Sequence, residues 1–578
     1  MAIIGIDLGT TNSLVSVYKD GQVQLIPNAF GEYLTPSVVS FGEDGEIFVG
    51  KIAKEMLITN PSRTFCEFKR NMGTEYVYHV GLRQYRAEDL SAFVLRHLKE
   101  NAEKFLGEPV TDAIISVPAY FDDDMRYATK YAGHLAKLNV ERLVNEPSAV
   151  ALKHHHTTEE SETFIVFDFG GGTLDVSLVD AFDNIVEIVA VAGDNHLGGK
   201  DFNEIIANDF FKKNKLNPET ISAYNKEIVL KESELLKRDL SVSNYATRKF
   251  LLDNKEYVME LTNQELIHIS TDLFKRLAEP LRKVINDVDM NWNDVDKIIL
   301  VGGSSKMPII KQYIKSLTDI PVVVDNNPDE SIALGVGMAA AIKERSGDIK
   351  DMILTDICPF SLGVDVVGNV FSPIIERNTS LPCKKSHTYV TLYDYQTKMT
   401  FNIYQGENLI ASDNHRLCTL SLEGLPALPK GEAGAIVTFM YDINGILDIQ
   451  IDPIGKGLIT GTGIHKAIVN NRLNLSADAL ETRIAHLHQM TMPPAEQEEN
   501  RLLIAKAERL YVECNPNIRN VIASRLTHFK TVLASQKGRT VREEYVRFLL
   551  FLEQIEQNVF EFEEFNESFW HEPTEDDK

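Results

Sequence analysis

Two short segments of the chain each place an aspartate at the end of an apolar run and follow it with a tight turn of glycine and threonine. The first, "GIDLGTTNS", holds Asp7, Gly9, Thr10, Thr11 and Asn12. The second, "FDFGGGTLDVS", holds Asp168, Gly170, Gly171, Gly172, Thr173 and Asp175. Glycine lets backbone N–H groups approach an anion closely, threonine adds hydroxyl donors, and a carboxylate can hold a hydrated cation beside phosphates. The two segments together predict a clamp for a magnesium triphosphate.

A third segment, "VDKIILVGGSSKMPIIKQYI", runs from an apolar strand pattern through Gly302 and Gly303 to an amphipathic helix pattern. A Gly-Gly turn after a buried strand admits close approach of a ribose or a phosphate. Each of these turns alone is also typical of ordinary hairpins and structural α/β units, so the prediction depends on their combination. The segment "GDNHLGGKD" resembles a Walker loop, but its lysine is one place late and Asp201 replaces the required Ser or Thr. We interpret it as a loop.

The elements that must position these turns follow from the patterns around them. Each aspartate turn lies between two runs of β-branched residues, which predicts two strand–turn–strand hairpins of one design and hence a duplicated α/β core. From residue 358 to about 470, apolar runs alternate with turn residues and predict antiparallel strands. After about residue 474, helical periodicity with polar faces predicts a set of helices.

Bulk composition limits the class of protein. The 578 residues, 44% hydrophobic and 25% charged, are enough for two or three folded units of about 100–200 residues or more. The net charge of −25 disfavours nucleic acid and anionic membranes as partners. Five cysteines without a CxxC pair favour a reducing compartment. Because we find no signal-peptide pattern and no apolar run of about 18 residues, we expect a cytoplasmic protein without a membrane span.

Six motifs in order, "GIDLGTTNS", "VPAYF", "NEPSAVAL", "FDFGGGTLDVS", "LVGGSSKMP" and "NPDESIALG", resemble the 70-kilodalton heat-shock chaperone family, a DnaK-like family. They span residues 3 to 337, and "DICPFSLGV" and "IYQGEN" extend the resemblance past residue 400. The "MILTDICPFSLG" junction and the short first half are most similar to the bacterial HscC-type branch. The resemblance implies a multidomain fold: an actin-like α/β ATPase domain with a duplicated ribonuclease-H-like core (1–350), a linker (351–357), a β-sandwich peptide-binding domain (358–473) and an α-helical lid (474–578).

The resemblance also implies ATP or ADP as the nucleotide, with Mg²⁺ and, as a further candidate, K⁺. The residues that it assigns to catalysis are Asp7, Lys69, Glu146, Asp168, Thr173 and Asp175, of which Asp7, Glu146 and Asp168 would hold the metal mostly through water. The residues that it assigns to nucleotide binding are Gly9, Thr10, Thr11, Asn12, Gly170, Gly171, Gly172, Glu234, Lys237, Ser241, Gly302, Gly303, Ser304, Lys306 and Asp329. By pattern alone, Lys69 would be a solvated lysine beside Arg70, and Glu146 only a turn and helix-start residue before Pro147. Lys306 stands where the family usually has arginine, which stacks better on adenine.

The second half is assigned in the same way. The peptide-binding positions implied are Val364, Val367, Tyr389, Leu392, Met399 and Phe401, which could equally be core positions of a sandwich. Met399 and Leu392 are larger than is usual, so we expect a narrower pocket and a changed peptide preference. The residues implied to link the two halves are Pro118, Arg126, Arg142 and Asp356. Arg142 and Asp356 suggest a J-domain co-chaperone, whereas a shortened stretch ahead of Glu234 leaves the need for a nucleotide exchange factor open.

We therefore predict an ATP-dependent molecular chaperone that binds short, extended apolar peptide segments of unfolded proteins. ATP would favour an open peptide site and ADP a closed one, so the two sites must influence each other reciprocally. An alternative from another class is a small-molecule kinase or filament-forming ATPase of the actin-like superfamily, although such proteins have no reason to append some 220 residues of strands and helices. A second alternative is a nucleotide-gated exchange partner of other chaperones.

Overall fold

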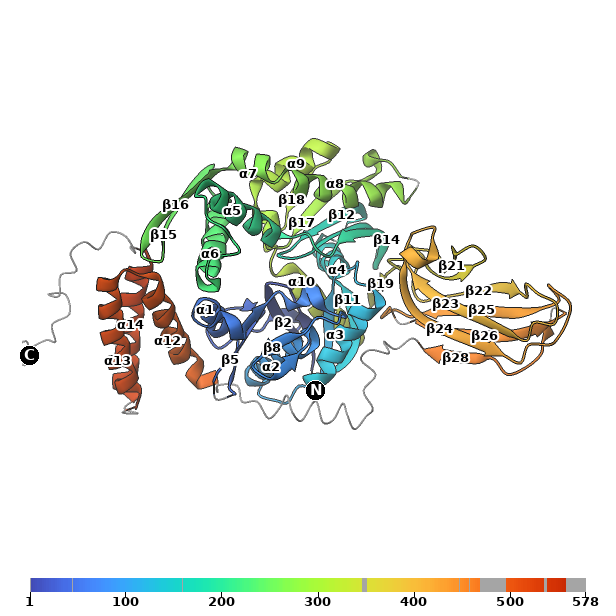
Figure 1. Cartoon of the computed structure of the whole chain (residues 1–578), viewed down its shortest axis with the longest axis horizontal. Coiled ribbons are helices and arrows are strands. Elements are labelled where there is room, and N and C mark those ends of the chain that lie inside the picture. Colours follow the sequence, from blue (N-terminus) through green and yellow to red (C-terminus); the bar gives the residue numbers. More distant parts are fainter. Residues whose placement is uncertain are drawn as a thin grey trace, which may run out of the picture.

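The structure is a computed structural model in which the described residues are 2–43, 45–158, 160–288, 290–345, 351–445, 447–456, 458–467, 495–534 and 538–557. Two α/β lobes form the centre of the molecule (Figure 1). A sandwich of antiparallel strands lies on one side of them, and a bundle of three helices lies on the opposite side (Figure 1). The predicted domain boundaries at 350/351 and 473/474 fall at or within segments 346–350 and 468–494, outside the described residues.

Lobe I, residues 2–158 together with helix α10, is built on the sheet β11-β10-β1-β2-β3. Its main strands are β1 (Ile3–Asp7), β2 (Asn12–Lys19), β3 (Gln22–Leu25), β10 (Asp112–Val117) and β11 (Asn139–Asn145). Strand β1 pairs antiparallel with β2 and parallel with β10, so the turn 8–11 emerges at the end of β1. Its helices are α1 (Lys51–Thr59), α2 (Ala87–Leu106), α3 (Asp123–Leu135), α4 (Glu146–Thr158) and α10 (Ser331–Lys343). The short strands are β4 (Thr35–Pro36), β5 (Val38–Phe41), β6 (Ile47–Val49), β7 (Thr64–Cys66), β8 (Tyr78–Val80) and β9 (Arg83–Tyr85).

Lobe II, residues 160–330, repeats that plan on the sheet β18-β17-β12-β13-β14, to which β19 adds at the edge. Strand β12 pairs antiparallel with β13 and parallel with β17, as β1 does with β2 and β10. The strands of this sheet are β12 (Glu162–Phe169), β13 (Leu174–Phe182), β14 (Ile185–Asp194), β17 (Lys297–Val301), β18 (Val322–Val324) and β19 (Ile353–Thr355). The other elements are α5 (Gly199–Lys213), α6 (Ala223–Asp239), β15 (Tyr245–Leu252), β16 (Lys255–Thr262), α7 (Asn263–Ile269), α8 (Thr271–Asn286) and α9 (Pro308–Thr318). Both predicted strand–turn–strand hairpins are present.

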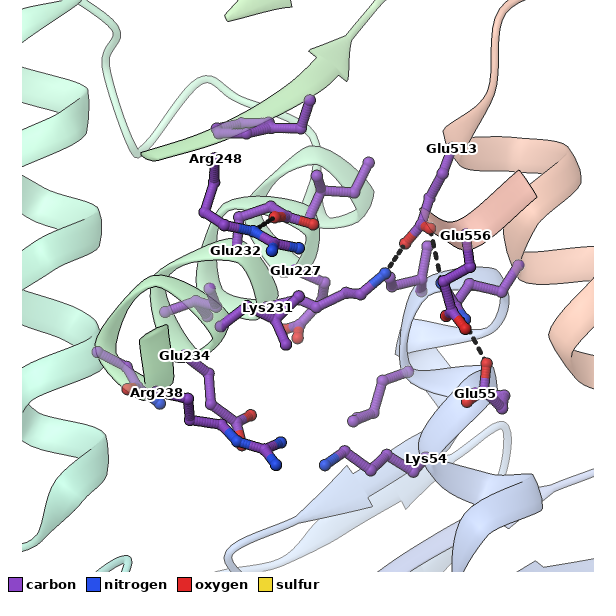
Figure 2. A pocket seen from close by; sticks show the side chains of 18 of the residues that line it. Lys54, Glu55, Glu227, Lys231, Glu232, Glu234, Arg238, Arg248, Glu513 and Glu556 are labelled. Carbon is purple, nitrogen blue, oxygen red and sulfur yellow. Dashed lines mark hydrogen bonds and ion pairs between the residues drawn. The ribbon is translucent and has the colours of Figure 1, made fainter. Parts of the chain in front are cut away.

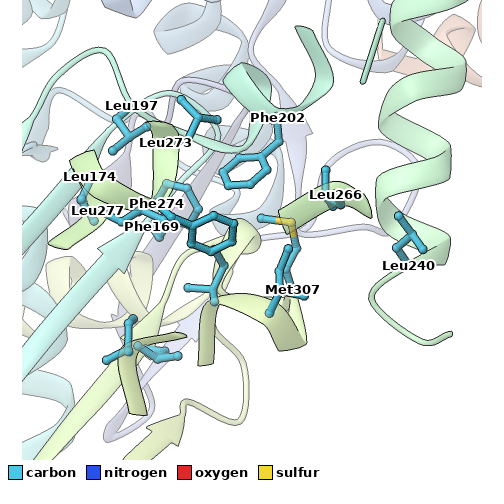
Figure 3. Close-up of a cluster of buried hydrophobic side chains, with 14 of the residues drawn as sticks. Phe169, Leu174, Leu197, Phe202, Leu240, Leu266, Leu273, Phe274, Leu277 and Met307 are labelled. Atoms are coloured by element: carbon cyan, nitrogen blue, oxygen red, sulfur yellow. The ribbon is translucent and has the colours of Figure 1, made fainter. Parts of the chain in front are cut away.

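An aromatic cluster holds the end of β12 in place (Figure 3). Phe169, the residue after Asp168, meets Phe202 of α5 edge to face with ring centroids 6.2 Å apart. Phe202 in turn meets Phe274 of α8 at 5.9 Å and 85°. These arrangements suit the ring quadrupoles and add about 0.5–1.5 kcal/mol per pair to the burial term. The packing therefore ties α5 and α8 to the strand that carries the second aspartate.

The sandwich begins where the predicted linker ends. Strand β19 of the linker pairs parallel with β14 of lobe II. One sheet of the sandwich has the order β21-β20-β23-β24, and the other is β22-β25-β26-β27 with β28 beside β26. Its strands are β20 (Leu362–Val366), β21 (Val370–Ile375), β22 (Cys383–Val390), β23 (Lys398–Gln405), β24 (His415–Glu423), β25 (Ala433–Tyr441), β26 (Leu447–Gly455), β27 (Leu458–Ile459) and β28 (Ile464–Ala467). All its pairings are antiparallel among the described residues, as predicted.

The sandwich docks on lobe I through a buried polar contact. Asp123, at the start of α3, accepts hydrogen bonds from the Tyr441 hydroxyl (2.7 Å) and from the Gln405 amide (3.1 Å). Burial raises the pKa of Asp123 to about 7. His415 lies 2.9 Å from Asp124 in the same interface. The interface is therefore held by polar contacts between residues nearly 300 positions apart.

The helical bundle consists of α12 (Ala495–Glu513), α13 (Pro516–Ala534) and α14 (Gly538–Gln557). Its core is apolar and includes Leu510, Phe529, Phe548 and Leu552. Helix α12 packs on α1 of lobe I (Figure 1). Among the helices that the structure describes, none combines the length and apolar character needed to cross a bilayer.

Candidate functional site

A cleft between the two lobes contains a cavity of about 770 Å³. The two hairpin turns, the turn at 302–306 and helix α6 all contribute to its wall. The predicted residues that line it are Asp7, Gly9, Thr10, Thr11, Asn12, Lys69, Glu146, Asp168, Gly170, Gly171, Thr173, Glu234, Lys237, Ser241, Gly302, Gly303, Ser304, Lys306 and Asp329. Of the residues predicted for catalysis or nucleotide binding, Gly172 and Asp175 are not part of this lining. The fold thus brings together residues that lie more than 300 positions apart in the sequence.

Four carboxylates gather at the floor of the cleft. Asp7 ends β1, Asp168 lies near the end of β12, and Asp175 is its register partner on β13. Burial, then repulsion from Glu146, raises the pKa of Asp7 to about 7 and that of Asp168 well above its ordinary range. The same two causes raise the pKa of Asp175 to about 7. The protein alone therefore provides too little positive charge for this cluster.

One buried lysine faces these carboxylates. Lys69, in the 3-10 turn Phe68–Asn71, donates to the Glu146 carboxylate at 2.7 Å, and both side chains are buried. The ammonium also lies 5.7 Å from the centre of the Phe121 ring. A lysine so enclosed is not the solvated side chain that pattern alone would suggest. Its position is instead suited to neutralising charge inside the cleft.

The cluster fits a divalent cation. With all four carboxylates ionised, Lys69 would leave a net charge of −3 (four negative, one positive) in a space that water scarcely reaches. The Asp175 Oδ2 and Thr11 Oγ1 atoms are buried without a hydrogen-bond partner. Among the described residues, however, no group of three or more histidine, cysteine or acidic side chains is arranged to hold a metal ion. A cation here would be held through its water shell, which is typical of Mg²⁺.

The glycines of the two hairpin turns allow the lobes to touch. A Cβ atom on Gly171 would lie 1.9 Å from the Thr11 Oγ1 atom, and one on Gly172 would lie 2.6 Å from the Thr10 side chain. Gly302 has a φ of +80°, and a Cβ there would lie 2.6 Å from Asp168 Oδ1. Any larger residue would push these turns apart. The glycines therefore set the width of the cleft at its floor.

Helix α6 forms the outer part of the cleft. Lys237 donates to the Gly199 carbonyl at 2.6 Å, and burial lowers its pKa to about 8. Burial opposes ionisation of Glu234, but Lys54 and Lys237 outweigh it, so the Glu234 pKa is lowered. Ser241 donates to the Lys237 carbonyl at 3.3 Å. On the opposite side of the cavity, Lys306 forms an ion pair with Asp329. The outer cleft thus carries fixed charges of both signs.

Two ion pairs that the motifs did not indicate cross the cleft. Arg70 of lobe I pairs with Asp201 of lobe II at 2.8 Å, and Lys200 pairs with Glu67. Asp201 also accepts from the Gly198 N–H at 2.6 Å, which caps α5. The interpretation of "GDNHLGGKD" as a loop is therefore wrong for its first two residues, which end β14, and for its last three, which begin α5. The signal was present, because an aspartate three residues after the start of a helix is typical of a capping box.

The residues predicted to bind peptide divide into two groups. Val364 and Phe401 are buried in the core of the sandwich, where Tyr389 and Met399 pack against them. The Tyr389 and Phe401 rings meet edge to face at 5.8 Å. Val367 and Leu392 are exposed, by 70% and 44%, after the ends of β20 and β22. Val364 and Phe401 therefore have the surroundings expected of core positions, which was the alternative interpretation of these two residues.

Of the four residues predicted to link the halves, Arg126, Arg142 and Asp356 lie where lobe I meets the linker and the sandwich. Arg126 donates to the Asn145 side chain at 2.7 Å and lies against Gly445 of the sandwich. Asp356 is buried and accepts from Ser148 at 3.0 Å. Burial lowers the pKa of Arg142, and the charge of Asp356 partly offsets that effect. Pro118 accepts from the Phe121 N–H at 3.2 Å, in the turn ahead of α3.

Comparison with models of protein families matches this chain to the family described as Hsp70 protein. The match covers residues 3–81 and 76–528. It therefore includes both lobes, the sandwich and most of the first two helices of the bundle. The resemblance to the HscC-type branch is finer than this match and stays a prediction.

Proposed function

Because this chain belongs to the Hsp70 family, whose members are ATPases and ATP-dependent chaperones, we propose that it hydrolyses ATP between its lobes and thereby opens and closes a peptide site in its sandwich. The observation that carries the proposal is the buried Lys69–Glu146 pair beside three carboxylates with raised pKa values. Such a site has a single cation amid excess negative charge, open to a cavity of about 770 Å³. It is suited to a ligand that brings its own metal, as Mg-ATP does.

Hydrolysis of a phosphoanhydride needs positioning and charge neutralisation more than covalent chemistry. Lys69 would orient the attacking water and offset the charge that develops on the γ-phosphate. Glu146 holds the Lys69 ammonium at 2.7 Å and so fixes where that charge acts. Asp7, Asp168 and Glu146 would hold the water shell of Mg²⁺, which when bound neutralises phosphate charge. Asp175 and Thr173 would orient the water and the phosphate from the second hairpin.

The two glycine turns would hold the phosphates, and α6 would hold the adenosine. Gly171, Thr10 and Thr11 line the cavity, and Gly172 lies next to the Thr10 side chain. Their backbone N–H groups and hydroxyls would donate to the phosphates. Glu234 and Lys237 line the cavity from α6 and Ser241 from the turn that follows it, with Gly302 and Gly303 also in the wall. Lys306 would lie beside the base, where an ammonium stacks less well than a guanidinium. We therefore expect weaker adenine stacking than an arginine would give.

Coupling to the sandwich would run through the linker and the buried contacts at lobe I. In this structure β19 pairs with β14, Asp356 pairs with Ser148, and Asp123 accepts from Tyr441. Release of these contacts would free the sandwich from the lobes. A nucleotide that binds more tightly to the docked or to the free form would therefore change the affinity of the peptide site, and a peptide would change the affinity for nucleotide by the same factor. The surface at Arg142 would receive a J-domain co-chaperone, and apolar segments of unfolded proteins would bind beside Tyr389, Leu392 and Met399.

The test is fluorescence anisotropy of a labelled Leu-rich peptide, bound in the presence of ADP and mixed rapidly with Mg-ATP. The wild type and Lys69→Ala should both release the peptide, because Lys69 acts in hydrolysis. Turnover of ATP should fall about 10²–10³-fold in Lys69→Ala only, and Lys275→Ala, which removes an exposed lysine of α8, serves as the matched control. If the peptide binds equally well with ADP and with ATP although ATP is consumed, the kinase alternative would be favoured instead.

A further inference from the structure

The helical bundle contacts both lobes, and it does so at the mouth of the cleft. Arg509 of α12 forms an ion pair with Glu55 of α1, in lobe I. Glu513, one turn further along α12, lies 2.5 Å from Lys231 of α6, in lobe II. Arg509 and Glu513 are themselves paired at 2.7 Å. A chain of alternating charges, Glu55–Arg509–Glu513–Lys231, thus runs from one lobe to the other through the bundle. Figure 2 labels three of its members, Glu55, Glu513 and Lys231.

At the centre of these ion pairs, Arg509 and Glu556 are held in their charged forms, and Arg509 and Glu513 are largely removed from water. Burial opposes the charge on Arg509, but Glu513, Glu55 and Glu556 outweigh it and raise the Arg509 pKa. Glu556 of α14 is likewise kept ionised: burial opposes its charge, yet Arg509 lowers its pKa to about 2. The side chains of Arg509 and Glu513 are only 5% and 13% exposed. Breaking one link would leave a half-buried charge without its partner, which costs more than losing an exposed pair.

The space behind these ion pairs adjoins the cavity of the candidate site. A second cavity of about 580 Å³ lies between α1, α6, strand β15 and the bundle (Figure 2). Both cavities have Lys54, Glu55, Lys200, Asn203, Glu234 and Arg238 in their walls. The shared wall lies beside Glu234, at the end of the cleft where the adenosine is proposed to bind. A nucleotide that leaves by this end would pass beneath the bundle.

We propose that the docked bundle straps lobe I to lobe II across the mouth of the cleft and so slows release of the nucleotide. The inference rests on the proposed nucleotide site. The strap's partner is this chain's own α12, recognised by charge: Arg509 binds the lobe I carboxylate Glu55, and Glu513 binds the lobe II ammonium Lys231. The lobes must separate for the nucleotide to leave, and separation requires that one of these links break first.

The experiment is a double-mutant cycle on the full-length chain, with Lys69→Ala as the background so that ATP is not consumed. Release of a fluorescently labelled ATP is followed by stopped flow after mixing with excess unlabelled ATP. Lys231→Met and Glu513→Gln should each speed release about five-fold, the effect of losing a half-buried ion pair. The double variant should be no faster than the faster single variant, because both changes cut the same link.

Two further variants separate the strap from a loss of packing. Lys231→Arg keeps the charge and should restore release to within about two-fold of the background rate, since the pair can re-form. Lys530→Met removes a lysine whose partner, Glu508, belongs to the bundle itself, and should leave release unchanged. The effect of Lys231→Met should also shrink as salt rises, because mobile ions screen the link.

The outcomes distinguish the inference from the proposed function. Failure of the background protein to bind labelled ATP would remove the nucleotide site and the inference with it. Binding with identical release rates in Lys231→Met and Glu513→Gln would overturn the strap alone. Slower release of the labelled ATP in Glu513→Gln would also overturn the strap. In that case Lys231, freed from Glu513, would pair with a lobe I carboxylate such as Glu55 and would hold the lobes together better than the bundle does.

Discussion

Removal of one hydroxyl, by Tyr441→Phe, should loosen the sandwich from lobe I. The hydroxyl donates to Asp123 at 2.7 Å, and both side chains are almost fully buried. Above about pH 7 the docked Asp123 carboxyl is ionised, and a hydrogen bond to a charged group contributes about 1.5–3 kcal/mol. Because the bond exists only while the sandwich is docked, its loss should shift docking toward the free state by about ten- to a hundred-fold.

Amide hydrogen exchange of the linker measures that shift. The Ile353 N–H donates to the Asn184 carbonyl at 2.8 Å, and β19 is paired to β14, so the linker amides exchange slowly while docked. In the nucleotide state that protects the wild-type linker most, Tyr441→Phe should speed exchange of residues 353–355 at least about ten-fold. The control is Tyr389→Phe, whose hydroxyl has its partner, Ser372, within the sandwich. Unchanged linker exchange in Tyr441→Phe would refute the reasoning that this buried bond holds the domains together.

Two further predictions concern protons and glycines. Docking buries Asp123 and raises its pKa from 3.8 to about 7, so the docked form binds a proton that the free form does not. Docking should therefore strengthen as pH falls from about 7 toward 5. Linker exchange measured across that range should lose most of its pH dependence in Asp123→Asn, and an unaltered pH dependence would assign it to another group. Gly171→Ala would place a Cβ 1.9 Å from Thr11 Oγ1 and push the phosphate turns apart. Calorimetry should therefore show ATP affinity reduced at least about ten-fold. The control is Gly81→Ala, at an open turn of lobe I, which should bind ATP like the wild type.

The features that the sequence predicted are local ones. An aspartate, a glycine turn and alternating β-branched runs lie within fourteen residues of one another, so the two hairpins could be read from "IIGIDLGTTNS" and "FDFGGGTLDVS". The antiparallel strands after residue 358 and the helices after residue 495 follow equally from local periodicity. The roles given to Lys69 and Glu146 needed the resemblance, because spacing alone does not distinguish a buried lysine from a solvated one.

Tertiary structure alone decided which distant residues meet. Lys69 and Glu146 are 77 positions apart, Asp123 and Tyr441 are 318 apart, and Lys231 and Glu513 are 282 apart. Single charged residues such as Arg509 carry no local pattern that reveals a partner, because ion pairing depends on how whole helices pack. The sequence by itself therefore determined the hairpins, the glycine turns and the kinds of domain. Only folding determined the charge of the cleft, the contacts that dock the sandwich and the strap across the mouth, since each is a property of surfaces brought together from separate parts of the chain.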